Sequence, residues 1–527
     1  MKFRRKFSVV KFKNLKYALG EMSFSKDWVT EFKRGDPYPI LEKDEGITEK
    51  TGNGRYLIEN NGTEKARVRR FIGSFTPFAS HAIDISEIEN GKVGFAFVCR
   101  GGDGSDFTPE NAPAVEVFVC KNGDTVTVGY KTKGKEIIEG SADYNGEILG
   151  KTLVVSTRPG FFDAYLVSDG NNEMICNVPL STNAEYTDPL AKAGKYAALN
   201  FRRNANVTDV CVFAELNAGG KAEIKNAEFY LDSGVSQADM RPIRYEDGTP
   251  IIDRGRIFLT MSIRLANSSY QGIVSWNPSG CDFKLEGALF FDVGDGFIGG
   301  DVATSLIYNR KTDKWMMWYC SFSHGHILAH GESIADPRYG INIIDTTLMQ
   351  CESKDKDGKA VISDDTLCLA KFGDEDPEFI YDAERGKWIL GICRLIRFPE
   401  ENNKIRYRYY FFESDNPYDG YTHIGHSNDG ENTGGSIVKT DHGYRFVCGS
   451  NFDARARYIN FDLYNLEDHE DLQFDYDDGG FRGWGSVFRF PCGSRYVYKM
   501  ITFDRHNGSP INNWSYGNLH VFEADEF

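Results

Sequence analysis

One plan recurs five times in the second half of this 527-residue chain, and it constrains the fold more than any other feature. Each copy has polar or acidic residues, a short apolar strand, a turn and an aromatic-rich strand. The copies begin at Glu246, Asp301, Asp374, Asn432 and Arg482. Their apolar positions follow one another after 55, 73, 58 and 50 residues and are Ile251, Leu306, Phe379, Ile437 and Val487.

A period near 50 residues with four short strands per unit is typical of a β-propeller. One small sheet cannot bury both of its faces alone, so successive sheets stack around a common axis. The repeat therefore predicts a five-bladed β-propeller over residues 236–527.

Residues 1–235 predict a separate antiparallel β-sandwich. Strand-like runs such as Val93–Val98 and Ala114–Val119 alternate with Asn-Gly, Asp-Gly and Lys-Gly turns, which is a hairpin pattern. The 14% aromatic residues and 54 glycines also favour strands and tight turns. The strand rhythm resembles that of concanavalin-like sandwiches. We expect an all-β chain whose sandwich either lends a loop to the propeller or serves as a dimerisation surface.

Composition limits the class of partner and the compartment. The chain has 61 Lys and Arg against 77 Asp and Glu, a net charge of −16, which argues against binding to nucleic acid or to an anionic membrane. The amino-terminal stretch is basic but lacks the apolar run of a secretory signal. Eleven cysteines occur singly, without C-x-x-C spacing, and indicate free thiols in a reducing compartment. We expect a soluble cytoplasmic protein, either monomeric or a homo-oligomer.

The starts of the repeats carry the candidate chemistry, because the first strand of each propeller blade lines the central channel. Several carboxylates at one channel mouth are costly unless they are protonated, paired or bound to a metal. An acid before a strand is also a common turn residue, and Asp-Gly at 247–248 is a turn signal by itself. Acids in register in three repeats favour a functional site. The converging residues are Glu246, Asp247, Asp301, Asp374, Glu375, Asp376, Glu431, Asn432, Arg482 and Trp484.

Segments such as DPEFIYDAERGKWILG and GGSIVKTDHGYRFVCGSN resemble blades of the five-bladed propeller glycosidases, which include glycoside hydrolase families 32, 43, 117 and 130. The resemblance implies a base or nucleophile at Asp247, with Glu246 as second choice. It implies an orienting acid at Asp301 and a general acid at Glu375. Three nearby acids compete for that last role, namely Asp374, Asp376 and Glu378. The W-M-N-D-P-N-G, R-D-P and E-C boxes of the retaining fructosidases are absent, so the particular family stays open.

Acetal cleavage explains why two carboxylates are needed: one protonates the departing oxygen while the other assists attack on the opposite face of the sugar. The resemblance favours inversion, in which the second carboxylate activates water. The expected substrate is a short oligosaccharide or glycoside. The residues expected to bind it are Glu246, Arg264, His326, Asp376, Arg394, Glu431, Arg482 and Trp484.

Two other functions stay open. Arg264, Arg394 and Arg482 would suit a glycoside phosphorylase, in which phosphate replaces water, and propellers also serve as non-catalytic carbohydrate-binding modules. No cofactor is required by either reaction. The histidines of His324–His330 lack a Cys or acid at ligand spacing, so no metal ligand set is predicted, although the resemblance allows a structural calcium ion in the channel.

Overall fold

The protein divides into two compact units, Tyr17–Asp232 (unit 2) and Met1–Lys16 with Ser233–Phe527 (unit 1). Each is described here by itself. Among the described residues, the regular elements are β-strands apart from a short 3₁₀ helix, η2 (Phe322–His324), so the chain is all-β as predicted. The structure is a computed structural model and describes residues 2–9, 15–24, 38–76, 78–101, 114–122, 125–132, 135–143, 149–158, 161–168, 171–179, 207–234, 236–264, 269–295, 298–349, 356–358, 373–398, 402, 404–428, 432–450, 457–475, 485–503 and 518–527.

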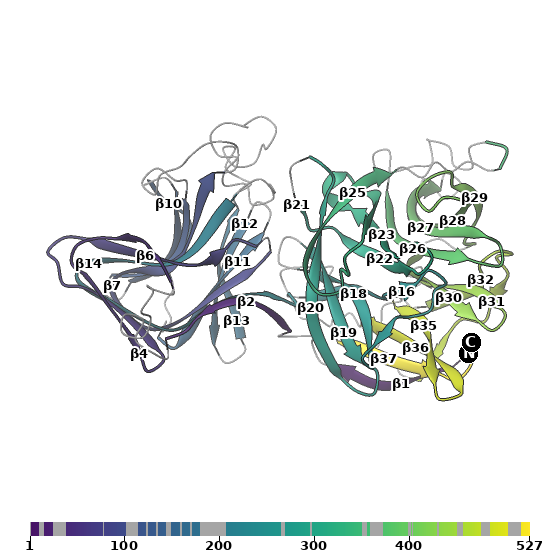
Figure 1. Ribbon diagram of the computed structural model, residues 1–527, viewed down its shortest axis with the longest axis horizontal. Coiled ribbons are helices and arrows are strands. Elements are labelled where there is room, and N and C mark those ends of the chain that lie inside the picture. The colour runs from purple at the N-terminus through teal and green to yellow at the C-terminus, as the bar shows by residue number, and fades with distance from the viewer. Residues whose placement is uncertain are drawn as a thin grey trace. The chain divides into compact units, whose positions relative to one another are not determined.

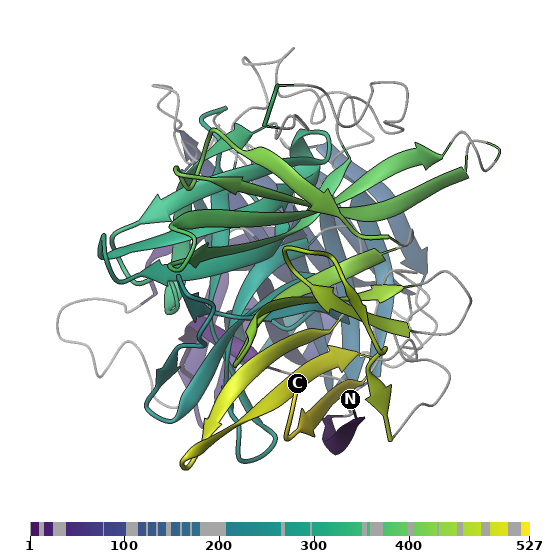
Figure 2. The same cartoon turned by 90° about the vertical axis from the view of Figure 1, so that its right-hand side faces the viewer.

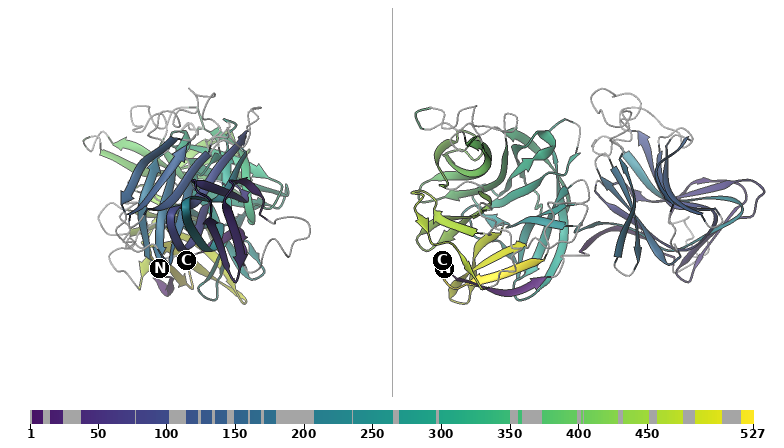
Figure 3. Two further views of the ribbon diagram at one scale, coloured as in Figure 1. Left: turned by 90° about the vertical axis from the view of Figure 1, so that its left-hand side faces the viewer. Right: turned by 180° about the vertical axis from the view of Figure 1, so that it is seen from behind.

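Unit 2 is built around two long strands that pair along most of their length, β7 (Ser80–Gly101) and β14 (Val207–Asp232). Inward-facing aliphatic and aromatic residues of these strands form its main core. Figure 3 shows the strongly curved strands. The other strands of this 13-stranded sheet are β2 (Lys16–Met22), β3 (Ile40–Lys43), β4 (Ile47–Gly52), β5 (Arg55–Asn60), β6 (Ala66–Ser74), β8 (Ala114–Asn122), β9 (Thr125–Thr132), β10 (Lys135–Asp143), β11 (Lys151–Arg158), β12 (Phe161–Ser168) and β13 (Asn171–Pro179).

Unit 1 consists of successive antiparallel groups of four strands, in which consecutive strands are neighbours (Figure 1). The first two groups join through the parallel pair β20–β25. The groups are β15 (Ser236–Pro242), β18 (Arg256–Arg264), β19 (Ser269–Asn277) and β20 (Asp282–Asp292); β22 (Val302–Asn309), β23 (Lys314–Ser321), β24 (Ile327–Ser333) and β25 (Gly340–Met349); β26 (Asp374–Asp382), β27 (Lys387–Phe398), β28 (Lys404–Ser414) and β29 (Thr422–His426); β30 (Asn432–Thr440), β31 (Gly443–Ser450), β32 (Arg457–Asp462) and β33 (Asp468–His469); and β35 (Ser486–Cys492), β36 (Arg495–Phe503), β37 (Leu519–Ala524) and β1 (Lys2–Val9). Short strands at their edges are β16 (Arg244–Tyr245), β17 (Ile252–Asp253), β21 (Ile298–Gly299) and β34 (Gln473–Phe474).

The turn between β26 and β27 shows how the sequence forms these hairpins. The Asp382 carboxylate accepts hydrogen bonds from the backbone N–H groups of Glu384 (2.9 Å) and Arg385 (3.3 Å). Gly386 then takes a φ of 65°, which glycine adopts without a steric penalty. Asp at the start of a turn and Gly at its end therefore reverse the chain here.

The first strand of each group is called its inner strand. Among the described residues, these strands are β15, β22, β26, β30 and β35, and each contacts the next. The last, β35, also contacts β15, so the inner strands form a closed ring. Residues that begin the inner strands therefore come from distant parts of the sequence to one end of this ring.

The amino-terminal strand differs from its predicted place in a domain of residues 1–235. β1 pairs antiparallel with β37 and parallel with β34, so the first residues of the chain complete the sheet formed by its last residues (Figures 1 and 2). Phe3 is fully buried against Val487, Tyr498 and Phe522. The alternating pattern of β1 identified a strand, but a strand's pattern does not name its partner.

Removing the Phe3 ring should destabilise unit 1. We expect Phe3→Ala to lower its free energy of unfolding by about 3–5 kcal/mol, because a large side chain is lost from a closed core. Urea denaturation with a probe in each unit measures this. Arg4→Ala, at an exposed position of the same strand, is the control and should change stability by less than about 0.5 kcal/mol. Equal effects of the two variants would contradict the role given to β1.

Candidate active site

Four inner strands carry the same irregularity at the same place. In each, three residue steps on the inner strand oppose two on its neighbour, which is a β-bulge. The first bulged residue has a positive φ in every case, between 49° and 62°. These residues are equivalent in the four groups and are Asp239, Ala303, Asp376 and Gly434.

This equivalence corrects the alignment made from the sequence. In the first group the bulge lies at Asp239, on β15, whereas the sequence alignment began that repeat at Glu246, beyond the end of the strand. Asp301 and Asp374 lie two positions before the bulged residue, and Glu375 lies one position before it. The predicted acids Asp247, Asp301 and Glu375 are therefore not in register.

A cluster of carboxyl groups lies at the bulges of β15 and β26. The Asp376 carboxylate accepts the backbone N–H of Gly434 (3.0 Å) and lies 3.4 Å from the Arg241 guanidinium. Burial, together with the neighbouring carboxylates of Asp239 and Glu375, raises the pKa of Asp376 to about 7. Burial and the two neighbouring carboxyl groups outweigh the nearby Arg241 guanidinium, so Asp376 holds a proton in weakly acidic solution.

Glu375 presents its carboxyl group beside two polar side chains. Its Oε2 lies 3.2 Å from Nε2 of His326, and it forms a hydrogen bond with the hydroxyl of Tyr407. Glu375 and His326 are each about 16% exposed, so the carboxyl group can meet both solvent and a ligand. His326 has a φ of 65°, an unusual backbone conformation of the kind found at functional sites.

Asp301 lies just before β22, and three hydrogen-bond donors surround its carboxylate. The hydroxyls of Ser321 and Ser323 donate to its Oδ2 at 2.8 Å each, and the backbone N–H of Ser323 donates to its Oδ1 at 3.1 Å. Both Asp301 and Glu375 raise the pKa of the Cys320 thiol, after the larger effect of burial, so the two acids share one neighbourhood. These bonds hold the Asp301 carboxylate in a fixed orientation.

Three predicted site residues have different surroundings from those expected. Asp374 and Arg394 are buried and form a bidentate ion pair, with one N–O distance of 2.6 Å. Arg264 lies 3.7 Å from the carboxylate of Asp239. Glu431, Arg482 and Trp484 lie outside the described residues.

Glu378, a competitor for the acid role, is part of a buried ion network further along β26. It accepts hydrogen bonds from Arg241 (2.9 Å) and Arg244 (2.7 Å), and from the backbone N–H of Ile437 (3.3 Å). All three charged side chains are 1–3% exposed. Two guanidinium groups around one carboxylate repel a cation, so these residues do not fit the calcium ion that the resemblance allowed.

Asp247 and Glu246 lie at the other ends of the inner strands. The Lys439 ammonium donates to Asp247 (3.0 Å), and Arg310 pairs with Glu246 (2.9 Å). They share a cavity with Asp382, the last residue of β26, whereas Asp374 is its first residue. Nine strand residues span about 25 Å, so the predicted catalytic Asp247 is separated from Glu375.

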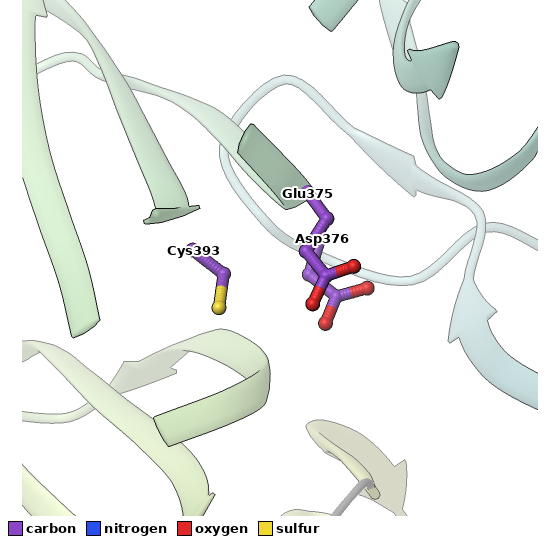
Figure 4. A group of neighbouring side chains, drawn as sticks. All are labelled: Glu375, Asp376 and Cys393. Carbon is purple, nitrogen blue, oxygen red and sulfur yellow. The ribbon is translucent and has the colours of Figure 1, made fainter. Parts of the chain in front are cut away.

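Glu375 also belongs to a group of three possible metal ligands. Ligand atoms of Glu375, Asp376 and Cys393 lie within 4.8 Å of one another (Figure 4). Burial raises the pKa of the Cys393 thiol well above its usual value, and the thiol donates to the backbone carbonyl of Asn432 (3.0 Å). A protonated thiol is a poor ligand, so this group does not favour a metal ion.

The sequence reasoning missed Asp239, Arg241 and Tyr407. The segment Ala238-Asp239-Met240-Arg241-Pro242 contains an acid before a short strand, which is the signal used in the other repeats. The segment Glu246-Asp247-Gly248 has the same signal eight residues later, so the sequence alone does not distinguish the two. The bulge that distinguishes the two segments is a pairing feature, which a single strand does not reveal.

Known proteins give limited comparisons. No protein-family model matches the chain, and no curated sequence is similar to it. Similar solved structures include a thermostable family-43 glycoside hydrolase, with 15% identity and a TM-score of 0.35 over 55% of this chain and 88% of that chain. Zg3597, a family 117 glycoside hydrolase from Zobellia galactanivorans, has 12% identity and a TM-score of 0.36 over 55% and 84%.

A third similar structure is the α-L-arabinofuranosidase PaAbf62A from Podospora anserina in complex with cellotriose. It has 12% identity and a TM-score of 0.36, over 56% of this chain and 92% of that chain. Because these TM-scores are low, a function for this chain has to be argued from the geometry of its own site.

The two ends of the inner strands should respond oppositely to charge removal. Burial alone would raise the pKa of Asp247, but hydrogen bonds from Lys439 and Thr249 outweigh it and lower that pKa to about 2. Asp247 therefore stabilises the fold above about pH 4, and this contribution is lost as the pH falls towards 2. We expect Asp247→Asn to lower the free energy of unfolding by about 1–2 kcal/mol at pH 7 and by little near pH 2, as measured by urea denaturation.

The Asp376→Asn substitution should raise the free energy of unfolding. The raised pKa of Asp376 means that ionisation costs stability as the pH rises from about 4 to about 7. A neutral amide of the same shape avoids that cost. The variant should gain stability relative to the wild type, by a few kcal/mol at pH 8 and by little at pH 4. Loss of stability at pH 8 would show that Asp376 is not held protonated by its neighbours.

Proposed function

We propose that this chain is a glycoside hydrolase whose active site lies at the starts of the inner strands of unit 1. The observation that carries the proposal is the group of acids Asp239, Glu375 and Asp376, with Asp301 close by. Asp239 lies on β15, Glu375 and Asp376 lie on β26, and Asp301 precedes β22, so the group joins distant parts of the sequence. Asp239 and Asp376 have a positive φ. Placing several carboxyl groups together costs free energy of folding, which favours a functional role for the group. Acetal hydrolysis needs carboxyl groups in different protonation states.

We also propose that unit 1 is a five-bladed β-propeller and that unit 2 is a concanavalin-like sandwich. The closed ring of inner strands and the successive four-stranded groups support the first assignment. Two long, curved, paired strands around an apolar core support the second.

In the proposed reaction, Glu375 is the general acid. Its carboxyl group is partly exposed, and His326 and Tyr407 orient it. It gives its proton to the glycosidic oxygen as the bond to the anomeric carbon breaks.

Asp239 takes the role that the sequence had given to Asp247. It lies on β15, with Arg264 at 3.7 Å, and like Glu375 it acts on the carboxyl group of Asp376. As a carboxylate it would accept a proton from the attacking water and direct that water to the anomeric carbon. Asp301, held by two serines, would position the sugar through its hydroxyl groups. We keep inversion as the proposed outcome, which NMR of the first-formed anomer tests.

The substrate proposed is a short oligosaccharide or glycoside. The phosphorylase alternative has little support, because Arg394, one of its expected phosphate ligands, is engaged by Asp374. We propose a reducing cytoplasmic location, which the free thiols of Cys120, Cys320 and Cys393 support. Among the described residues, no helix has the length and apolarity to span a membrane.

Amide variants of the three acids test this function. On a panel of aryl furanosides and pyranosides, Glu375→Gln should lower kcat by about 10²–10⁴-fold. The loss should shrink for a dinitrophenyl leaving group, which departs without protonation. Asp239→Asn should lower kcat equally for good and poor leaving groups, because it removes the base. Asp301→Asn should lower kcat and raise KM.

Asp525→Asn is the matched control, because that carboxylate is exposed and remote from the cluster. It should turn over like the wild type. Near-normal turnover of all three acid variants would reject the proposed site. Tight binding of sugars without turnover of any glycoside by the wild type would favour the carbohydrate-binding alternative.

A further inference from the structure

The opposite ends of the inner strands enclose a cavity that the proposed reaction does not use. It has a volume of about 940 Å³, which is within the range of ligand-binding pockets. Its floor includes Asn309, Asp382 and Thr440, which are the last residues of β22, β26 and β30. We call it the far-end cavity.

The buried ion network separates this cavity from the acid cluster. Glu378 lies near the middle of β26 and is bound by Arg241 and Arg244, which come from β15 and β16. These three side chains are almost completely buried, so they fill the space between the two ends of the inner strands. A ligand in the far-end cavity would therefore be held apart from Glu375 and Asp239.

Tyrosine rings are held in place around the far-end cavity. The Tyr444 hydroxyl donates to the backbone carbonyl of Asp247 (3.1 Å), and the Tyr464 hydroxyl donates to Asp382. Tyr381 packs against Trp388, with ring centroids 5.1 Å apart. All three tyrosines are partly exposed, and the Arg385 guanidinium lies over the Tyr464 ring, 4.3 Å from its centroid. The remaining ring faces are already fixed in place, so a ligand can stack on them at a low cost in conformational entropy.

Most of the charged side chains that line the cavity are already paired. Four cationic side chains that line it each pair with a carboxylate, at distances between 2.5 and 3.0 Å; they are Arg310, Lys314, Arg385 and Lys439. A phosphate or sulfate would have to displace these carboxylates, and Asp247 stays ionised because its pKa is about 2. Three further lining carboxylates are engaged as well, Asp382 by Tyr464, Asp415 by Lys387 and Asp441 by Arg489, so a cationic ligand would have to displace these partners. The lining therefore suits an uncharged ligand with many hydroxyl groups.

We propose that the far-end cavity is a second, non-catalytic binding site for a neutral oligosaccharide. Sugar rings would stack on the tyrosine faces, and their hydroxyls would bond to the carboxylates and to the unused N–H groups of Lys439 and Arg310. The choice of a sugar among neutral ligands rests on the proposed function. A second site of this kind would keep a chain bound near the enzyme between rounds of cleavage.

Calorimetry of the full-length protein tests the site. Glu375→Gln provides a background without turnover, and the probes are maltotriose, laminaritriose, chitotriose and inorganic phosphate. We expect one of the trisaccharides to bind at two sites and phosphate to leave the far-end cavity unfilled. In this background, Ala383→Trp should abolish one of the two binding events, because Ala383 is exposed on the cavity wall and a large ring there blocks it.

Tyr381→Ala should weaken the same event at least tenfold by removing a stacking face. Tyr496→Ala, at an exposed tyrosine on β36 away from the cavity, is the control and should bind like the background protein. Because Ala383→Trp adds a side chain at the surface, it tests the site even if Tyr381→Ala fails to fold. Unchanged trisaccharide binding by Ala383→Trp would overturn the proposal.

The result is distinguishable from failure of the proposed function. Two-site binding that Ala383→Trp reduces to one site supports the cavity whether or not the acid variants lose turnover. Near-normal turnover by Glu375→Gln, Asp239→Asn and Asp301→Asn would reject the catalytic site alone. Phosphate binding that Ala383→Trp abolishes would reject the neutral ligand.

Discussion

The buried network of Arg241, Glu378 and Arg244 is the constraint on which the arrangement of unit 1 depends. Ions removed from water are tolerated only when partners and hydrogen bonds surround them, and here one carboxylate receives two guanidinium groups and a backbone N–H. The network ties β26 to β15, β16 and β30. It therefore connects strands that are far apart in the sequence.

The two ends of the inner strands have different electrostatics. At one end, burial and neighbouring carboxylates raise the pKa of Asp376 to about 7. At the other end, Lys439 and Thr249 lower the pKa of Asp247 to about 2. A carboxyl group that holds a proton at one end and carboxylates paired with cations at the other suit proton transfer and passive binding respectively, and the proposals for the two ends follow from this difference.

The bulges explain how a repeated strand presents acids at more than one position. A bulge turns the strand locally and re-aims its side chains, and it requires a residue that tolerates a positive φ. Aspartate and glycine tolerate that conformation better than most residues, and three of the four bulged positions carry one of them. Asp239 and Asp376 therefore point into the cluster from equivalent places, while Glu375 and Asp301 reach it from adjacent positions.

The sequence by itself determined that the chain is all-β, with strands of alternating pattern and turn residues between them, because these depend on local periodicity. It also selected Asp301 and Glu375, because each is an acid followed by an apolar run typical of a strand. In the structure both lie close enough to Cys320 to raise the pKa of its thiol. The sequence did not separate Asp239 from Asp247, and it placed residues 2–9 in the amino-terminal domain, whereas β1 pairs with β37. Only the tertiary structure decided those points, because strand pairing and bulges arise between segments hundreds of residues apart, and the buried ions select one register among several that local patterns allow.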